Sequence, residues 1–382
     1  MFRLPGEEFS LSFSMIVLPG DGIGPEVTRE AVRVLDWFGT HQGLDVTVRH
    51  ELYGATAYHA HSVAIKEDVF ADLTEVDAVL FGATGGPEYD EIPKEAKRNG
   101  NLLRIRQHME VFANLRPVIG YDELADTISM KPEAIHGVDM MIVRELNGGI
   151  YFGKPRGIDT SPNGFERGTN TLVYETPEIE RITRFAFELA KQRGGHLHSI
   201  DKSNVLETHQ LWRKVVTRIG AEEYRDIPLE HMIVDNCAMQ IIRDPKQFDV
   251  MLADNMFGDI LSDLAGGISG SLGMLPSASL SAPNDAGDRG RRRALYEPVH
   301  GSAPDIAGQG VANPLGAILS LALALELSFD APDAAKMLRR AVRGALAKGV
   351  RTPDIVPNGH DAASTTEMTD AVLSELQHLH NA

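Results

Sequence analysis

Short apolar runs alternate along the chain with segments whose apolar residues recur at helical spacing. Residues 15–18 form an apolar run, and a Gly/Pro-rich turn separates them from residues 27–38, which have a helical pattern. Further buried strands are predicted at residues 45–50, 78–81 and 140–143. Strands that alternate with helices predict an α/β fold with a largely parallel sheet.

The rest of the chain continues this alternation with one interruption. Residues 150–167 are rich in Gly, Pro and Asn, which predicts a loop or a small exposed arm. Apolar spacing predicts a helix at 178–192 and strands at 231–234 and 248–252. The longest apolar stretch, 315–325, is shorter than the ~20 residues of a membrane-spanning helix, so we expect a buried helix there.

Length and charge limit the possible architectures and partners. The chain has 382 residues, which favours two domains because domains cluster near ~100–200 residues. A net charge of −17 disfavours nucleic acid and an anionic membrane as partners. The single cysteine, Cys237, excludes an intrachain disulfide and favours a reducing compartment, which we expect to be the cytoplasm. Residues 1–14 lack the features of a secretory signal and are expected to form an N-terminal extension.

A glycine-rich turn follows the first predicted strand. It reads Gly20-Asp-Gly22-Ile-Gly24-Pro25 and resembles the dinucleotide fingerprint, in which backbone N–H groups face a pyrophosphate. The spacing fails, because the last glycine of that fingerprint would fall at Pro25. A tight strand-to-helix turn with proline in the first helical turn explains the same residues, so a nucleotide is expected elsewhere.

Two carboxylates, Asp259 and Asp263, are four residues apart and share one face of a predicted helix. Mg²⁺ and Mn²⁺ take oxygen ligands, so the pair can hold a divalent cation with a third carboxylate. Asp235, expected to close the strand at 231–234, is the candidate for that third ligand. An ordinary helix with two solvated acids explains the spacing equally well.

Three arginines, Arg106, Arg116 and Arg144, lie near predicted element ends, and a trio of guanidinium groups suits a dicarboxylate. Tyr151 and Lys202 offer an acid and a base for proton transfer beside a divalent cation. Surface ion pairs for each arginine, and packing or solvation for the tyrosine and the lysine, are the alternatives.

A tight Gly/Pro loop at residues 297–308 contains a histidine and an acid. An adenine can stack on His300, and Asp305 can accept both ribose hydroxyls while repelling a 2′-phosphate, which favours NAD over NADP. The basic run at 289–293 argues for a phosphate, but it lies in the polar segment 281–293, which we expect to be a solvated loop.

These segments together resemble the β-decarboxylating dehydrogenases, the family of isocitrate, isopropylmalate, tartrate and D-malate dehydrogenases. The resemblance runs from about Met15 to the C-terminus and rests on long motifs in the same order: LPGDGIGPEV, FANLRP, VRELNGGIYFGKPRG, DKSNVL, FGDILSD, GSLGMLPSASL and EPVHGSAPDIAG. They look like the isopropylmalate branch of that family.

The resemblance implies two lobes that share a large twisted mixed sheet, not a Rossmann fold. Residues 15–114 with 271–382 would form the larger, cofactor-binding lobe. Residues 115–270 would form the substrate and dimerisation lobe, with a small arm near 150–170. It also implies a homodimer whose active sites are built across the interface.

The resemblance also implies a role for each candidate residue. Arg106, Arg116 and Arg144 would bind the malate carboxylates, and Asp259 and Asp263 would bind Mg²⁺ or Mn²⁺. Lys202 and Asp235 would come from the other subunit, with Asp235 near both metal and substrate. Lys202 would be the base, and Tyr151 would donate a proton to C3. Cofactor contacts would fall on Gly85, Gly86, His300, Gly301, Ser302, Ala303, Asp305, Ile306 and Asn313.

The implied activity is the NAD-dependent oxidative decarboxylation of 3-isopropylmalate to 2-oxo-4-methylpentanoate, a step of leucine biosynthesis. Leu102 and Leu103 match the leucines that line the isopropyl pocket. The preceding segment reads Arg98-Asn99-Gly100-Asn101 where many such enzymes have Pro-Glu, so another 3-substituted malate, D-malate, tartrate or isocitrate stays open. An alternative of another class is a non-catalytic metabolite-binding subunit.

Overall fold

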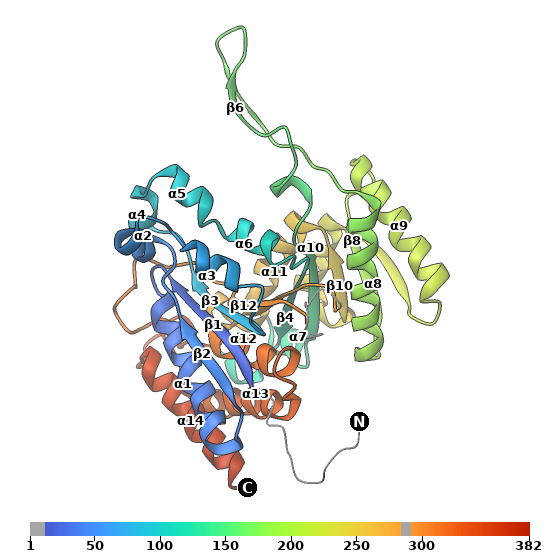
Figure 1. Cartoon of the computed structure of the whole chain (residues 1–382). Helices are drawn as coiled ribbons and strands as arrows, with labels where there is room; N and C mark the ends of the chain where they lie inside the picture. The colour runs from blue at the N-terminus through green and yellow to red at the C-terminus, as the bar shows by residue number, and fades with distance from the viewer. Residues whose placement is uncertain (1–11, 284–291) are drawn as a thin grey trace, which may run out of the picture.

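The computed structural model describes residues 12–283 and 292–382, and its central feature is one large mixed sheet (Figure 1). The order of its strands is β2-β1-β3-β12-β11-β4-β5-β10-β8-β9. The first half consists of β1 (Phe13–Gly20), β2 (Val46–His50), β3 (Ala78–Ala83), β11 (Pro276–Leu280) and β12 (Ala294–Pro298). The second half consists of β4 (Ala113–Ile119), β5 (Asp139–Glu145), β8 (Leu197–Asp201), β9 (Leu229–Ile233) and β10 (Val250–Ala253).

Most neighbouring strands are parallel, but the middle of the sheet is not. β11 pairs antiparallel with both β12 and β4, and β4 pairs antiparallel with β5. The mixed sheet of two lobes is therefore confirmed. The first half comes from residues before 84 and after 275, and the second from residues 113–253. The lobe boundaries expected from the sequence, 15–114 with 271–382 and 115–270, stay a prediction.

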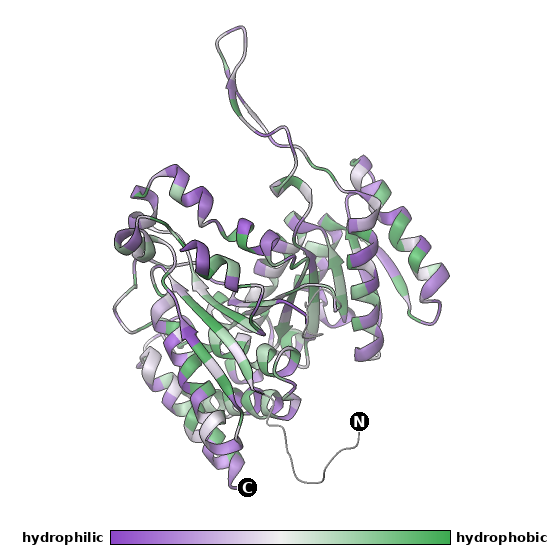
Figure 2. Ribbon diagram, in the orientation of Figure 1, coloured by the Kyte–Doolittle hydropathy of each residue, from purple (hydrophilic) through white to green (hydrophobic). Residues whose placement is uncertain are grey.

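Long helices cover the sheet in two groups. On the first half they are α1 (Gly24–Gln42), α12 (Leu315–Leu327), α13 (Pro332–Ala347) and α14 (Thr365–His380). On the second half they are α8 (Thr176–Arg193), α9 (Glu207–Glu223), α10 (Val234–Arg243) and α11 (Asn255–Ser269). Figure 2 shows hydrophilic residues on the outer helices and hydrophobic residues along the central strands. α12 is apolar all round and buried, as a helix between a sheet and other helices must be.

Short helices border the first lobe: α2 (Ala55–His61), α3 (Glu67–Asp72), α4 (Pro87–Glu91), α5 (Lys94–Asn99) and α6 (Leu102–His108), and α7 (Pro132–Ile135) lies before β5. The strands β6 (Gly157–Thr160) and β7 (Glu166–Thr169) form a separate hairpin that projects from the body (Figure 1). The exposed arm expected there is confirmed.

The expected N-terminal extension and the expected polar loop both lie partly outside the described residues. β1 begins at Phe13, inside the extension expected at 1–14, and residues 1–11 lie outside the described part. Much of the polar segment 281–293, including Arg289, also lies outside it. Among the described residues, no helix has the length and apolar character needed to span a membrane.

Candidate active site

One carboxylate, Asp259, joins three of the predicted site residues. It lies on α11, and it accepts hydrogen bonds from Arg116 Nη2 at 3.2 Å, from Tyr151 Oη at 3.2 Å and from Arg144 Nη1. Arg116 comes from β4 and Arg144 from β5, so adjacent strands present both guanidinium groups to the same helix. The structure therefore gathers two cations, a phenol and a carboxylate that the sequence spreads over 143 residues.

The second carboxylate of the predicted metal pair lies one helical turn further on. Asp263 accepts from Arg116 Nη1 at 3.3 Å, and its side chain is 53% exposed. Burial and the charge of Asp259 raise the pKa of Asp263, which a bound cation would offset. Two accessible carboxylates four residues apart on one helix supply the oxygen donors that Mg²⁺ and Mn²⁺ prefer.

Arg144 is held more tightly than the other two arginines. Its Nε and Nη2 both donate to Asn255 Oδ1, at 3.0 and 2.7 Å, and its side chain is buried. Burial and the neighbouring charge of Arg116 lower the pKa of Arg144 to about 10. A Cβ on Gly258 would lie 2.7 Å from the Arg144 side chain, so the glycine of the FGD motif allows α11 to approach β5.

Arg106 has a different partner. It lies on α6 and forms a buried ion pair with Glu297 at the end of β12. Burial is the main cause that lowers the pKa of Arg116 and Arg144, and the charge of Arg106 adds to it. Such repulsion among three guanidinium groups is relieved by a bound anion. The carboxylate of Glu297 was not among the predicted site residues.

Leu102 and Leu103 form the first turn of α6, and both are half-buried. Asn101 caps this helix, because its Oδ1 accepts from the Leu103 backbone N–H at 2.6 Å. Asn99 is the last residue of α5 and is exposed. The segment that departs from the isopropylmalate pattern therefore forms the connection between two short helices.

Lys202 and Asp235 form a pair of their own. Lys202 follows β8, and its Nζ lies 2.5 Å from Asp235 Oδ2. The expectation that Asp235 closes a strand is wrong, since β9 ends at Ile233 and Asp235 lies in the first turn of α10. Within the described residues of one chain, no group of three acidic, histidine or cysteine side chains is placed to hold a metal, so Asp235 does not join Asp259 and Asp263 there.

His209 connects these two parts of the site. Its Nδ1 accepts from the Lys202 backbone N–H at 2.8 Å, so Nε2 carries the proton that it donates to Asp254 Oδ2, 3.2 Å away. Asp254 also caps α11 by accepting from Phe257 N at 2.6 Å. Both side chains are fully buried. Sequence reasoning missed His209 because a histidine in a helix has no local signal for such a role.

Three loops meet where the cofactor is expected. Gly85 and Gly86, both with positive φ, follow β3 and lie opposite Ser302. Asp21 accepts from Gly85 N at 2.9 Å, and Ile23 N donates to the Ser302 carbonyl at 2.8 Å, so the first glycine turn positions the other two loops. This turn therefore has a structural role, which agrees with a glycine spacing that does not match the dinucleotide fingerprint.

His300 and Asp305, which lie in the Gly/Pro loop at residues 297–308, have different surroundings. Burial lowers the pKa of His300, whose Nε2 is buried without a hydrogen-bond partner among the described residues. Asp305 is exposed, Gly301 has no atom within 4 Å of an added Cβ, and Ala303 has a positive φ. A neutral ring beside open backbone and a free carboxylate can accept a nucleoside.

The last predicted cofactor residues are Ile306 and Asn313. Ile306 is half-buried in the same loop. Asn313 is buried, and its amide is already used: Nδ2 donates to Asp354 at 3.0 Å and Oδ1 accepts from Leu315 N at 3.0 Å. In the structure Asn313 therefore stabilises the start of α12.

Comparisons with known proteins agree on one family. The family model described as isocitrate/isopropylmalate dehydrogenase matches residues 14–372. The chain is 52% identical to the 3-isopropylmalate dehydrogenase of Rhodospirillum rubrum over 97% of this chain and all of the relative. It is 53% identical to 3-isopropylmalate dehydrogenase 1 of Bordetella bronchiseptica, with 96% of this chain and 98% of the relative covered.

Solved structures show the same fold. Isocitrate dehydrogenase from Methylococcus capsulatus is similar with a TM-score of 0.82 at 30% identity, covering 96% of this chain and 99% of that one. A β-decarboxylating dehydrogenase from Thermococcus kodakarensis is similar with a TM-score of 0.75 at 33% identity, with 97% of each chain covered.

Proposed function

Because this chain belongs to the isocitrate/isopropylmalate dehydrogenase family, we propose that it catalyses the NAD-dependent oxidative decarboxylation of 3-isopropylmalate, a step of leucine biosynthesis. The observation that carries the proposal is the cluster of Arg116, Arg144, Tyr151 and Asp259. Relatives named 3-isopropylmalate dehydrogenase at about half identity over nearly the full length support the choice of substrate.

The substrate is a dianion, and the three arginines are its counter-charges. Arg116 and Arg144 approach from the strands and Arg106 from α6, next to Leu102 and Leu103. The arginines are paired with Glu297 and Asp259. Binding therefore exchanges protein carboxylates for substrate carboxylates, and the adjacent leucines are positioned to contact the apolar C3 substituent.

Asp259 and Asp263 would hold a divalent cation. When bound, it stabilises negative charge on the C2 oxygen and on the enolate that forms as CO₂ leaves. Because Asp259 also accepts from Arg116 and Arg144, the carboxylate that would hold the cation is in direct contact with the arginines that would bind the substrate.

Lys202 would take the proton from the C2 hydroxyl, and Tyr151 would donate a proton to C3. Burial, followed by the charge of Asp259, raises the pKa of Tyr151, which keeps its phenol protonated and able to donate. Asp235, 2.5 Å from the Lys202 amine, orients the base.

NAD would bind between the Gly85-Gly86 turn and the loop from His300 to Ile306. When bound, it accepts the hydride from C2. The half-buried ring of His300 offers a stacking surface for adenine, and the exposed Asp305 carboxylate can accept the ribose hydroxyls. The same carboxylate repels a 2′-phosphate, so NAD is preferred over NADP.

We propose that the active enzyme is a homodimer in which Lys202 and Asp235 complete the site of the second copy. Two observations support this. Within the described residues of one chain, Lys202 pairs with Asp235, and Asp235 does not join Asp259 and Asp263 in a metal-binding group. Large apolar side chains are exposed on the helices beside them, with Ile242 53% and Ile260 59% exposed. Apolar patches of this kind mark protein interfaces.

The buried, unpaired Cys237 supports a reducing compartment, which we propose to be the cytoplasm.

A substrate panel tests the proposal. The enzyme should convert 3-isopropylmalate with NAD and Mn²⁺ at a higher kcat/KM than isocitrate, D-malate or tartrate. A clear preference for any of those three would overturn the assignment. Ligand binding without turnover on the whole panel would support a non-catalytic subunit instead.

A further inference from the structure

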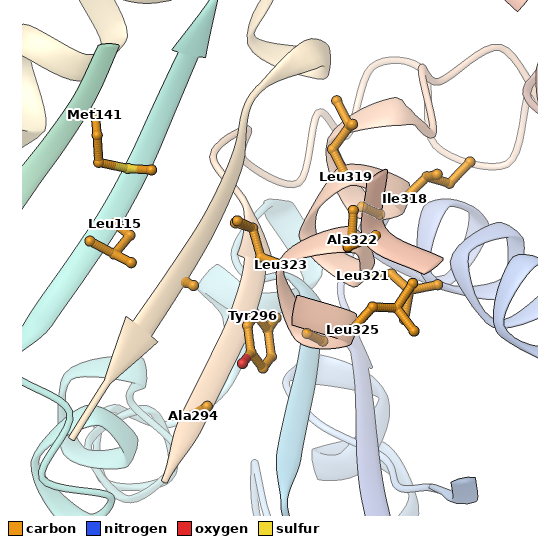
Figure 3. Close-up of a cluster of buried hydrophobic side chains, with 14 of the residues drawn as sticks. Leu115, Met141, Ala294, Tyr296, Ile318, Leu319, Leu321, Ala322, Leu323 and Leu325 are labelled. Atoms are coloured by element: carbon orange, nitrogen blue, oxygen red, sulfur yellow. The ribbon is translucent and has the colours of Figure 1, made fainter. Parts of the chain in front are cut away.

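A cavity of about 570 Å³ lies between the two lobes. Its walls are apolar and come from both halves of the molecule: Leu115, Pro117, Met141 and Leu189 from the second lobe, and Leu319 and Leu323 from α12. Figure 3 shows Leu115 and Met141 on one side and Leu319 and Leu323 on the other. Its volume is within the range of about 300–1,000 Å³ typical of small-molecule sites.

The cavity is distinct from the active site because it lies on the other face of β4 and β5. Side chains alternate along a strand, so Leu115 and Pro117 face the cavity, whereas Asn114 and Arg116 face α11. A molecule in the cavity would contact the back of the strand that carries Arg116 without reaching Asp259.

The rim of the cavity has more cationic than anionic side chains. Three arginines, Arg193, Arg339 and Arg343, line it together with two acids, Asp139 and Glu326. The acids are already paired, Asp139 with Arg193 at 2.8 Å and Glu326 with Arg339. Arg193 also pairs with Asp249 at 2.6 Å, so the rim cation whose acidic partner is more distant is Arg343, 3.4 Å from Glu123.

Arg343 has N–H donors that are not used by protein partners among the described residues. Its contacts are long, 3.4 Å from Nη1 to Glu123 Oε2 and 3.2 Å from Nη2 to the Gly120 carbonyl. Its guanidinium carbon lies 5.1 Å from the ring centre of Tyr121, another wall residue. A guanidinium has five N–H donors, so most of those on Arg343 are available to a ligand.

We propose that this cavity binds a small monocarboxylate with a branched or aromatic apolar body, whose carboxylate pairs with Arg343. The apolar body displaces water from the leucine and methionine walls, and the carboxylate stays at the partly solvated rim. The site is independent of the proposed function, since no residue of the active site lines it.

The ligand would contact both lobes at once. It therefore stabilises the arrangement of lobes in which the cavity is open. If substrate binding changes that arrangement, the substrate changes the affinity for the carboxylate, and the carboxylate changes the affinity for the substrate by the same factor. The cavity is thus placed to act as a regulatory site for metabolites of this class.

The test measures binding of 4-methylpentanoate to the full chain by titration calorimetry, with the uncharged 4-methylpentanamide as the matched probe. We expect the acid to bind and the amide to bind at least about tenfold more weakly, because the amide lacks the negative charge that pairs with the Arg343 guanidinium. No binding of the acid, or equal binding of both, would overturn the proposal.

Variants locate the site. Arg343→Gln should weaken binding of the acid about tenfold or more, whereas Arg340→Gln, on the same helix but exposed and outside the cavity, should leave it within about twofold. Leu323→Trp should fill the cavity and abolish binding, and thermal unfolding checks that this variant is folded. Binding that survives both cavity variants and disappears with 3-isopropylmalate and Mn²⁺ is in the active site and would contradict the proposal.

Discussion

Among single residues, Lys202 has the most demanding role in the proposed reaction, that of the base. Lys202→Met removes the amine but not the arginines or the metal carboxylates. Turnover should fall by about 10²-fold or more, while Mn²⁺-dependent binding of the substrate is kept. Steady-state kinetics and calorimetry measure the two effects. Lys214→Met, an exposed lysine on α9, is the control, and retained activity in Lys202→Met would refute the role of the base.

The half-buried His300 predicts a dependence of stability on pH. Burial lowers its pKa in the folded state, whereas an unfolded histidine titrates near ~6.5. Below that pH the unfolded chain takes up a proton that the folded chain does not, so the free energy of unfolding decreases as pH falls, by at most about 1.4 kcal/mol per pH unit. Denaturant unfolding from about pH 7 to about pH 5 should show a smaller decrease for His300→Gln than for the wild type. Identical slopes would contradict this.

At the scale of elements, His209 joins the end of β8 to the start of α11. In His209→Asn, the side-chain oxygen takes the place of Nδ1 and still accepts from Lys202 N. In His209→Gln, the side-chain nitrogen takes the place of Nε2 and still donates to Asp254. Each substitution leaves one buried group unpaired and should lower the free energy of unfolding by about 1–3 kcal/mol.

The kinetics of these two variants should differ. His209→Gln frees the Lys202 backbone and should lower kcat, with the KM for NAD unchanged. His209→Asn frees Asp254, the cap of the helix that carries Asp259, and should mainly raise the Mn²⁺ concentration needed for half-maximal rate. If both variants changed kcat and the Mn²⁺ requirement equally, His209 would be only a packing residue.

The sequence predicts elements where the signal is local, and fails where the partner is distant. The carboxylates of α11 and the arm near 150–170 follow from spacing and composition, and both occur. β11, with the sequence PSASL, has low strand propensity and forms because β12 and β4 flank it. Glu297 was missed because its partner, Arg106, is 191 residues away.

Asp235 shows a different limit. The apolar pair before it suggests that the strand continues, but the helix α10 begins at Val234. Element boundaries are the least certain part of any such prediction. The pairing of Asp235 with Lys202 was still implied by the family resemblance, which assigns both residues to one site.

At the scale of the whole molecule, the proposed shared site predicts complementation between inactive subunits. Lys202→Met and Asp259→Asn each inactivate both sites of a homodimer. A mixed dimer would have one site with intact Lys202 and intact Asp259. After unfolding and refolding together, the mixture should recover up to about a quarter of the wild-type activity, since half of the dimers are mixed and each has one intact site.

The same experiment distinguishes a site shared between two subunits from a complete site in each chain. If each chain carried a complete site, every subunit in the mixture would lack one essential group and no activity would return. Gel filtration of both variants should give the elution volume of the wild type, so that a failure to recover activity reflects the sites and not the assembly.

The stoichiometry of a single reaction tests the proposed oxidative decarboxylation directly. 3-Isopropylmalate, NAD and Mn²⁺ are incubated with the enzyme, and NADH, CO₂ and 2-oxo-4-methylpentanoate are quantified at the same times. We expect equal amounts of all three at every time. NADH without matching CO₂, or no NADH at all, would contradict it.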